Sequence, residues 1–227
     1  MTSQITITID GGSGVGKGTI TTLLAQKLNY TTIDSGAMYR ALAYMLHSKQ
    51  KVPKTVTQKD VEHIQFFYNN SILYVNTQEL KNQAVEDLPI RTQENSQHAS
   101  NYATLPIIRK HVTGQIRSIM SKGGVILEGR DAGSVIYPHA QVKFYIECPV
   151  EVRAQRRLED YRKKGILYTQ EEVELELEER DHQDMTRETD PLTIPKNAYM
   201  IANDGTRTLE ELIEMMHNIV KQHFNKE

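Results

Sequence analysis

The chain has 227 residues, of which 38% are hydrophobic and 25% are charged, and its formal net charge is −2 at pH 7. This composition is ordinary for a globular protein, and the charge gives no overall reason to expect nucleic-acid binding. No stretch approaches the roughly 18 consecutive apolar residues of a membrane span, and the first residues lack the basic and apolar regions of a secretory signal. We therefore expect a cytoplasmic protein without membrane or nucleic-acid partners, folded as one domain over 1–227 and monomeric.

The cysteine and histidine content limits the disulfides and metal sites that the chain can form. Cys148 is the single cysteine, so no intramolecular disulfide can form, and we expect a buried structural thiol. The eight histidines show no spacing typical of metal ligands, and no His-Glu-x-x-His motif occurs. The sequence therefore predicts no metal site built from protein side chains.

The first predicted elements are a strand, a glycine-rich loop and a helix. Ile5, Ile7 and Ile9 alternate with threonines, which is typical of a strand, and apolar residues recur with helical spacing between 23 and 28. Further strands are predicted where short apolar or β-branched runs lie between helix-like segments, at 31–34, 124–129, 142–148 and 198–204. This alternation predicts an α/β fold with a mainly parallel central sheet.

Two regions interrupt the alternation. Residues 55–101 are polar and irregular, with a strand-like run at 71–76, and resemble a small inserted unit. Residues 150–190 change from basic to acidic and predict two charged helices around a break at Gly165.

The glycine-rich loop matches the Gly-x-x-x-x-Gly-Lys pattern of phosphate-binding loops, with its strand before it and its helix after it. Glycines let the backbone N–H groups surround phosphate oxygens, and Lys17 can reach the β- and γ-phosphates of a nucleoside triphosphate. A Rossmann Gly-x-Gly-x-x-Gly is not completed. The residues expected to bind ATP are Gly11, Gly12, Ser13, Gly14, Val15, Gly16, Lys17, Gly18 and Thr19.

The loop also indicates the class of protein. Gly18 stands where most such loops carry the hydroxyl residue that binds Mg²⁺, and Thr19 follows one position later, so we expect phosphates and waters to hold the ion. This Gly-Lys-Gly-Thr form is similar to that of nucleoside monophosphate kinases. An Asn-Lys-x-Asp guanine motif is missing, and the strand at 124–129 does not end in the Asp of a motor ATPase, so transfer to a second small substrate is favoured.

Arginines are available to bind such a substrate. Arg40 follows the predicted strand at 31–34, and Arg130 and Asp131 follow another strand, at the carboxyl edge where α/β sheets bind ligands.

A helix would place Arg180, Asp184 and Arg187 on one face. Arginine forks suit phosphate oxygens, although a surface ion-pair ladder would show the same spacing. Arg153, Arg156 and Arg157 share another predicted face. They could close over the triphosphate as part of a mobile lid or belong to a solvated basic helix, and the sequence leaves both open.

These motifs together resemble the bacterial type of cytidylate kinase. The segments "IDGGSGVGKGT", "DSGAMYRA", "EGRDAGSVIYP" and "ERDHQDMTRETDPL" carry the resemblance, which covers most of the chain. It implies a three-layer P-loop kinase fold with a central parallel sheet, a CMP-binding insertion at about 55–101 and a helical lid at about 150–190. After "GRD" the chain has Ala132-Gly133-Ser134, where the family usually has a larger aliphatic residue and Gly-Thr.

The resemblance also implies roles for single residues. The phosphates and sugar of CMP would be bound by Ser35, Arg40, Arg130, Asp131, Arg180, Asp184 and Arg187. Ser100 and Arg109 would recognise the cytosine ring, and Lys17, Arg153 and Arg157 would stabilise charge on the migrating phosphoryl group.

The expected reaction is transfer of the γ-phosphoryl group from MgATP to CMP or dCMP, giving ADP and CDP or dCDP, in pyrimidine nucleotide metabolism. A kinase for UMP, AMP or shikimate is the nearest alternative enzyme. A regulator that binds nucleotide without turnover is the alternative from another class.

Overall fold

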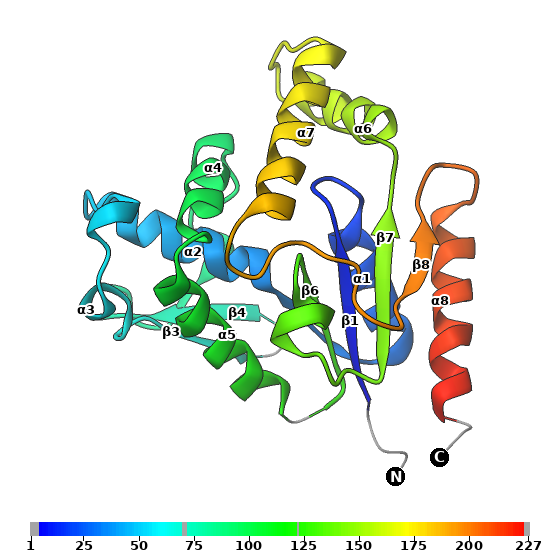
Figure 1. Cartoon of the computed structure of the whole chain (residues 1–227), viewed down its shortest axis with the longest axis horizontal. Helices are drawn as coiled ribbons and strands as arrows, with labels where there is room; N and C mark the ends of the chain where they lie inside the picture. The colour runs from blue at the N-terminus through cyan, green and yellow to red at the C-terminus, as the bar shows by residue number, and fades with distance from the viewer. Residues whose placement is uncertain (1–4, 70–71, 122, 225–227) are drawn as a thin grey trace. The chain divides into compact units, whose positions relative to one another are not determined.

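The computed structural model of the chain describes residues 5–69, 72–121 and 123–224. The chain divides into two compact units (Figure 1). The first unit comprises Met1–Thr32 and Gly123–Glu227, and the second unit comprises Ile33–Lys122. The second unit contains all of 55–101, and the division into one domain with an insertion and a lid stays a prediction.

The larger sheet has five strands in the order β2-β6-β1-β7-β8, and all of them except the second half of β2 belong to the first unit. The pairs β1–β6, β1–β7 and β7–β8 are parallel. The strands are β1 (Thr6–Gly11), β2 (Thr31–Asp34), β6 (Val125–Gly129), β7 (Val142–Glu147) and β8 (Tyr199–Ala202). Every strand predicted for this sheet is therefore confirmed, within two residues at each end.

Helices flank this sheet, which confirms the α/β fold class. In the first unit they are α1 (Lys17–Leu28), α6 (Val150–Lys163), α7 (Gln170–Thr186) and α8 (Leu209–Phe224), with a short π-helical segment at Ala132–Ile136. The two charged helices predicted around Gly165 are α6 and α7. None of the described helices combines the length and apolar character needed to cross a bilayer.

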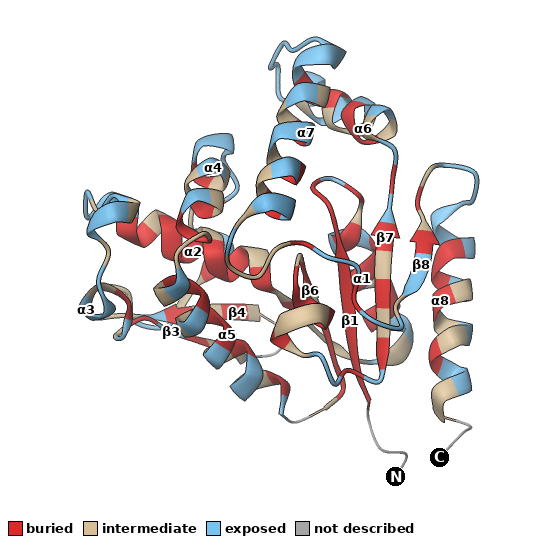
Figure 2. Cartoon of the chain, in the orientation of Figure 1, coloured by how far each residue is buried: buried red, intermediate tan, exposed pale blue. Residues whose placement is uncertain are grey.

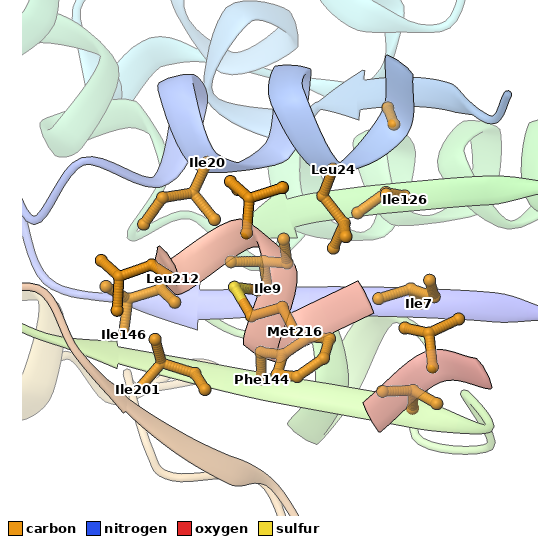
Figure 3. Close-up of a cluster of buried hydrophobic side chains, with 14 of the residues drawn as sticks. Ile7, Ile9, Ile20, Leu24, Ile126, Phe144, Ile146, Ile201, Leu212 and Met216 are labelled. Carbon is orange, nitrogen blue, oxygen red and sulfur yellow. The ribbon is translucent and has the colours of Figure 1, made fainter. Parts of the chain in front are cut away.

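The core of the first unit lies between the sheet and the pair α1 and α8. Figure 3 shows Ile9 of β1, Leu24 of α1, Phe144 of β7 and Met216 of α8 packed together, and each is fully buried. All six residues of β1 are buried, as expected for an inner strand of a parallel sheet covered on both faces (Figure 2). Cys148 belongs to this core, which confirms a buried thiol.

The second unit combines helices with a small antiparallel sheet. Its helices are α2 (Ser35–Ser48), α3 (Gln58–Val61), α4 (Gln93–Tyr102) and α5 (Pro106–Met120), with 3₁₀ turns at Pro53–Thr55 and Val85–Asp87. Its sheet has the order β3-β4-β5, formed by β3 (Gln65–Asn69), β4 (Ile72–Asn76) and β5 (Gln83–Ala84).

The expectation of an irregular segment at 55–101 is thus wrong in part. Apart from the run at 71–76, the sequence analysis did not predict these strands. The reason is that only alternate side chains, such as Phe66, Leu73 and Val75, are buried in a largely polar stretch.

Candidate active site

The glycine-rich loop links β1 to α1 and adopts a conformation that requires its glycines. Gly16 has φ +91°, a left-handed conformation, and a Cβ atom built on it would lie 2.5 Å from Nδ2 of Asn203. A Cβ on Gly12 would lie 2.9 Å from both carboxylate oxygens of Asp181. Side chains from the end of β8 and from α7 therefore approach the loop backbone where glycine leaves room.

Lys17 begins α1 and turns its ammonium group back onto the loop. Nζ donates hydrogen bonds to the carbonyl oxygens of Gly11 and Gly12, at 2.8 and 2.5 Å. Burial lowers the pKa of Lys17 well below its usual range, and the charge of Arg130 lowers it further. Negative charges brought near the loop would favour the protonated form.

Two residues of α6 and α7 hold the loop at Ser13. Asp181 Oδ1 accepts a hydrogen bond of 2.7 Å from the Ser13 N–H, while Arg153 donates 2.8 Å to the Ser13 carbonyl and forms an ion pair with Asp181. All three residues are buried. The structure thus places Arg153, expected in the lid, at the phosphate loop, and it adds Asp181 as a contact that the sequence analysis missed.

Arg157 lies one turn further along α6 and has different neighbours. Its guanidinium is 3.2 Å from Glu176 of α7 and lies over the ring of Tyr161, so it joins the two charged helices. The structure therefore separates Arg153, which touches the loop, from Arg157, which does not touch it through any described contact.

A buried network of opposite charges adjoins the loop across the sheet. The register pairs Asp10 with Gly129, so Gly11 of the loop and Arg130 leave neighbouring strands at the same edge. Arg130 Nε donates 2.7 Å to Asp184, and Arg187 lies 3.3 Å from Asp184 and 3.4 Å from Asp131. The structure thus brings together four of the residues predicted to bind a phosphorylated substrate.

The charges of the arginines keep Asp184 of this network ionised. Burial alone would raise the pKa of Asp184, but the charges of Arg130 and Arg187 hold it below its usual value, and Arg180 contributes in the same direction. Arg180 lies on α7 one turn before Asp184. Arg187 is the C-cap of α7, one residue beyond Thr186, and its N–H donates to the Gln183 carbonyl. Its side chain therefore reaches Asp184 on the predicted face, although the helix itself ends before it.

Asp10 is a further residue that the sequence analysis missed. Its carboxylate accepts hydrogen bonds of 2.6 and 2.8 Å from the N–H groups of Ala132 and Gly133. Burial raises the pKa of Asp10 to about 7, against the lowering effect of these two bonds. Asp10 thereby fixes the turn that follows Arg130 and Asp131. An aspartate inside the β1 strand pattern was the available signal, since a buried carboxylate needs partners.

In the second unit, the start of α2 carries two predicted residues. Ser35 is the first residue of α2 and is buried, and Asp34 caps the helix by accepting 2.8 Å from the Ala37 N–H. Arg40 lies 3.0 Å from the same carboxylate and is half-buried. The cap therefore also orients Arg40.

Ser100 and Arg109 lie on consecutive helices of the second unit. Ser100 is on α4 and partly exposed, whereas Arg109 on α5 is only 2% exposed. The Arg109 guanidinium donates 3.2 Å to the Ala103 carbonyl and lies 5.6 Å from the ring centre of Tyr39. A fully buried cation with these contacts is a fixed donor rather than a solvated side chain.

A cavity of about 420 Å³ opens beside the phosphate loop within the first unit. Its walls include Gly12 and Val15 of the loop, Arg153 and Asp181 of the helices, and Cys148. This volume, with the loop and Arg153 in its walls, suits an elongated ligand with a phosphate end.

The surroundings of Gly18 fit a hydrated divalent cation. Thr19 is exposed, and a carboxylate oxygen of Glu128 would lie 3.7 Å from a Cβ built on Gly18. An anionic group thus stands beside the position where many phosphate loops place a hydroxyl, and Mg²⁺ readily binds carboxylates through its waters.

Comparisons with known proteins agree with this geometry. The solved gluconokinase from Sinorhizobium meliloti 1021 is similar in fold, with a TM-score of 0.50 at 13% identity, covering 100% of this chain and 97% of that one. A cytidylate kinase of Thermotoga sp. (strain RQ2) is 33% identical over 222 residues, covering 96% of this chain and 98% of the relative. A cytidylate kinase of Pasteurella multocida (strain Pm70) is 34% identical over 232 residues, covering 99% of each chain. The family model described as Cytidylate kinase matches residues 7–222. The chain therefore belongs to the cytidylate kinase family.

Proposed function

We propose that the protein transfers the γ-phosphoryl group of ATP to CMP or dCMP, giving ADP and CDP or dCDP. One observation carries the proposal: the phosphate loop and the Arg130-Asp131 turn leave neighbouring strands at the same edge of one parallel sheet, where Asp184 and Arg187 complete a charge network with them. A donor phosphate and an acceptor phosphate can therefore be bound side by side in the first unit.

The residues of the loop would bind the donor. The backbone N–H groups of 11–16 would surround the β-phosphate, and Lys17 would exchange its two loop carbonyls for phosphate oxygens. Arg153, already held at Ser13, would stabilise the charge that develops on the migrating phosphoryl group, and Arg157 would contribute from α6 in a lid formed by 150–190.

The arginines of the network would bind the acceptor. Arg130 and Arg187 would bind the phosphate of CMP with Arg180, while Asp131 and Asp184 would hold those arginines and contact the ribose. In the second unit, Ser35 and Arg40 would contribute to sugar and phosphate binding, and Ser100 and Arg109 would recognise the base. A fixed donor such as Arg109 suits base selection, because an unmatched buried polar group costs about 1 to 3 kcal/mol.

No protein nucleophile is needed, because the acceptor phosphate already carries negative charge. The protein would act by positioning and by charge stabilisation. Mg²⁺ would supply further charge stabilisation between the phosphates, and Thr19 and Glu128 would bind its waters. We also propose a monomeric enzyme of pyrimidine nucleotide metabolism in the cytoplasm.

The test is ADP formation from MgATP with CMP, dCMP, UMP, AMP and GMP in parallel, with Lys17→Ala as the blank. We expect turnover with CMP and dCMP at least about tenfold above the other acceptors, which corresponds to a single unmatched polar group.

Two other outcomes would indicate a different substrate or a different activity. Turnover with UMP or AMP alone would keep the kinase and reject base recognition by Ser100 and Arg109. ATP binding without turnover on any acceptor would indicate a nucleotide-binding regulator instead.

A further inference from the structure

The second unit brings together three potential metal ligands that the proposed reaction does not use. His47 lies in the last turn of α2, and Glu94 and His98 lie on α4. One ligand atom from each side chain can be chosen so that all three lie within 4.8 Å of one another. The imidazole rings of His47 and His98 are 3.9 Å apart between centres, in an edge-on arrangement.

The backbone holds this cluster in place. Glu94 and His98 are four residues apart on α4 and therefore share one face of the helix. The neighbouring Asn95 is buried and donates 3.0 Å to the carbonyl of Arg40, about two turns before His47 on α2, so a hydrogen bond ties α4 to α2. The ligands thus come from two helices that are joined by a partly buried hydrogen bond.

The side chains themselves are free to adjust. His47 and Glu94 are exposed, His98 is partly exposed, and no hydrogen bond or ion pair of these three side chains occurs within 5–69, 72–121 and 123–224. A tetrahedral ion with ligands at about 2.1 Å needs ligand atoms about 3.4 Å apart, which small side-chain rotations from the present spacing can reach.

We propose that His47, Glu94 and His98 form a site for a divalent transition metal of the zinc type. Two imidazoles and one carboxylate are the donor set that zinc accepts, whereas Mg²⁺ and Ca²⁺ prefer oxygen ligands throughout. Solvent reaches the site, so water completes the coordination. The bound ion joins the last turn of α2 to the first turns of α4. Sequence patterns do not reveal the site, because His47 is distant in sequence from the other two ligands.

The test uses the untagged full chain, stripped with a chelator and titrated with Zn²⁺ and Co²⁺. We expect one equivalent of Zn²⁺ to bind, Co²⁺ to give the visible absorption of a low-coordinate site, and Zn²⁺ to raise the midpoint of thermal unfolding. His47→Gln and His98→Gln should each weaken Zn²⁺ binding by about 100-fold or more, since loss of even an outer-shell partner costs 10- to 100-fold. Glu94→Gln, which preserves the side-chain shape, should weaken it in the same direction.

His139→Gln is the matched control, because His139 is an exposed histidine of the first unit, outside the cluster. It should bind Zn²⁺ like the unaltered chain. Circular dichroism without metal checks that all variants fold. The proposal is overturned if the unaltered chain binds no Zn²⁺, or if it and a His47→Gln/His98→Gln double variant bind Zn²⁺ equally.

Discussion

Asp184 contacts two largely buried arginines, so removing its charge should destabilise the folded protein. Its two carboxylate oxygens face Arg130 and Arg187 separately, and its side chain is only 9% exposed. An amide at this position keeps the size but removes the charge. Two largely buried guanidinium groups would then lose the carboxylate that both contact, while Arg187 would keep its 3.4 Å approach to Asp131.

Asp184→Asn should therefore lower the free energy of unfolding by about 3 kcal/mol, the usual cost of breaking a buried ion pair. Urea denaturation at neutral pH measures the change. Asp160→Asn is the control, because Asp160 is exposed and its only described ion pair, with Lys163, is 4.0 Å long; it should change stability by less than about 0.5 kcal/mol. Equal effects of the two substitutions would show that the network does not stabilise the fold.

Gly16 is a position at which the loop has no room for a side chain. An alanine would have to adopt φ +91° with its Cβ 2.5 Å from Asn203 Nδ2, whose amide donates 2.9 Å to the Val15 carbonyl. Gly16→Ala should reduce ATP affinity at least about tenfold, because the loop must shift.

Gly114→Ala is the matched control for that experiment. Gly114 lies in α5, and a Cβ there meets nothing within 4 Å. This substitution should leave ATP affinity unchanged and stabilise the protein by about 0.5 to 1 kcal/mol. Isothermal titration with a non-hydrolysable ATP analogue gives the affinities, and unchanged binding by Gly16→Ala would contradict the assigned loop conformation.

Among the elements, α7 joins the two halves of the candidate site in the first unit, because it carries Asp181 at the loop and Asp184 in the network. Its N-terminus is closed by a capping box: Thr169 accepts from the Glu172 N–H at 3.2 Å, and Glu172 accepts from the Thr169 N–H at 2.8 Å. The start of α7 is thus set by local sequence rather than by packing.

Thr169→Ala should destabilise the protein by about 1 kcal/mol, because it leaves an N–H at the helix start without its partner. Thr169→Ser restores the hydroxyl and should recover most of the loss. Thermal or urea unfolding of the three chains gives the comparison. If serine were no better than alanine, the lost contact would be the methyl group and not the cap.

At the scale of the whole molecule, the sequence predicts the strands, helices and motifs that short segments determine. It does not predict the contacts between segments that are far apart in the chain. Strand β1, the glycine loop and the two charged helices were predictable, because hydrophobic period, glycine spacing and charge are read over short windows. The partners Asp10, Asp181 and Asn203 were not, since each contacts a loop or turn far away in sequence. The end of α7 was also missed, because it depends on the Leu192 N–H folding back onto Asp184.

The free energy of unfolding of the whole protein should depend on pH because of the Asp10 carboxyl group. Its pKa is raised to about 7 in the folded protein, so the folded state keeps a proton that the unfolded chain loses above its ordinary pKa of 3.8. This contribution to stability is fully present below that value and is lost as the pH rises through about 7.

The stability of the unaltered chain, relative to that of Asp10→Asn, should therefore fall between pH 4.5 and 6.5 by up to about 1.4 kcal/mol per pH unit. Urea denaturation of both chains at four pH values in this window gives the slope of the difference. A difference that stays constant with pH would mean that Asp10 is ionised in the folded protein.

The most direct measurement of the central claim follows the phosphoryl group itself. ATP labelled at the γ-phosphate is incubated with Mg²⁺, CMP and the protein, and the products are separated. We predict that the label moves to the β-phosphate of CDP in step with ADP formation, and that the Lys17→Ala chain fails to move it. Label recovered as inorganic phosphate, or label that stays in ATP while the nucleotide remains bound, would contradict transfer to CMP.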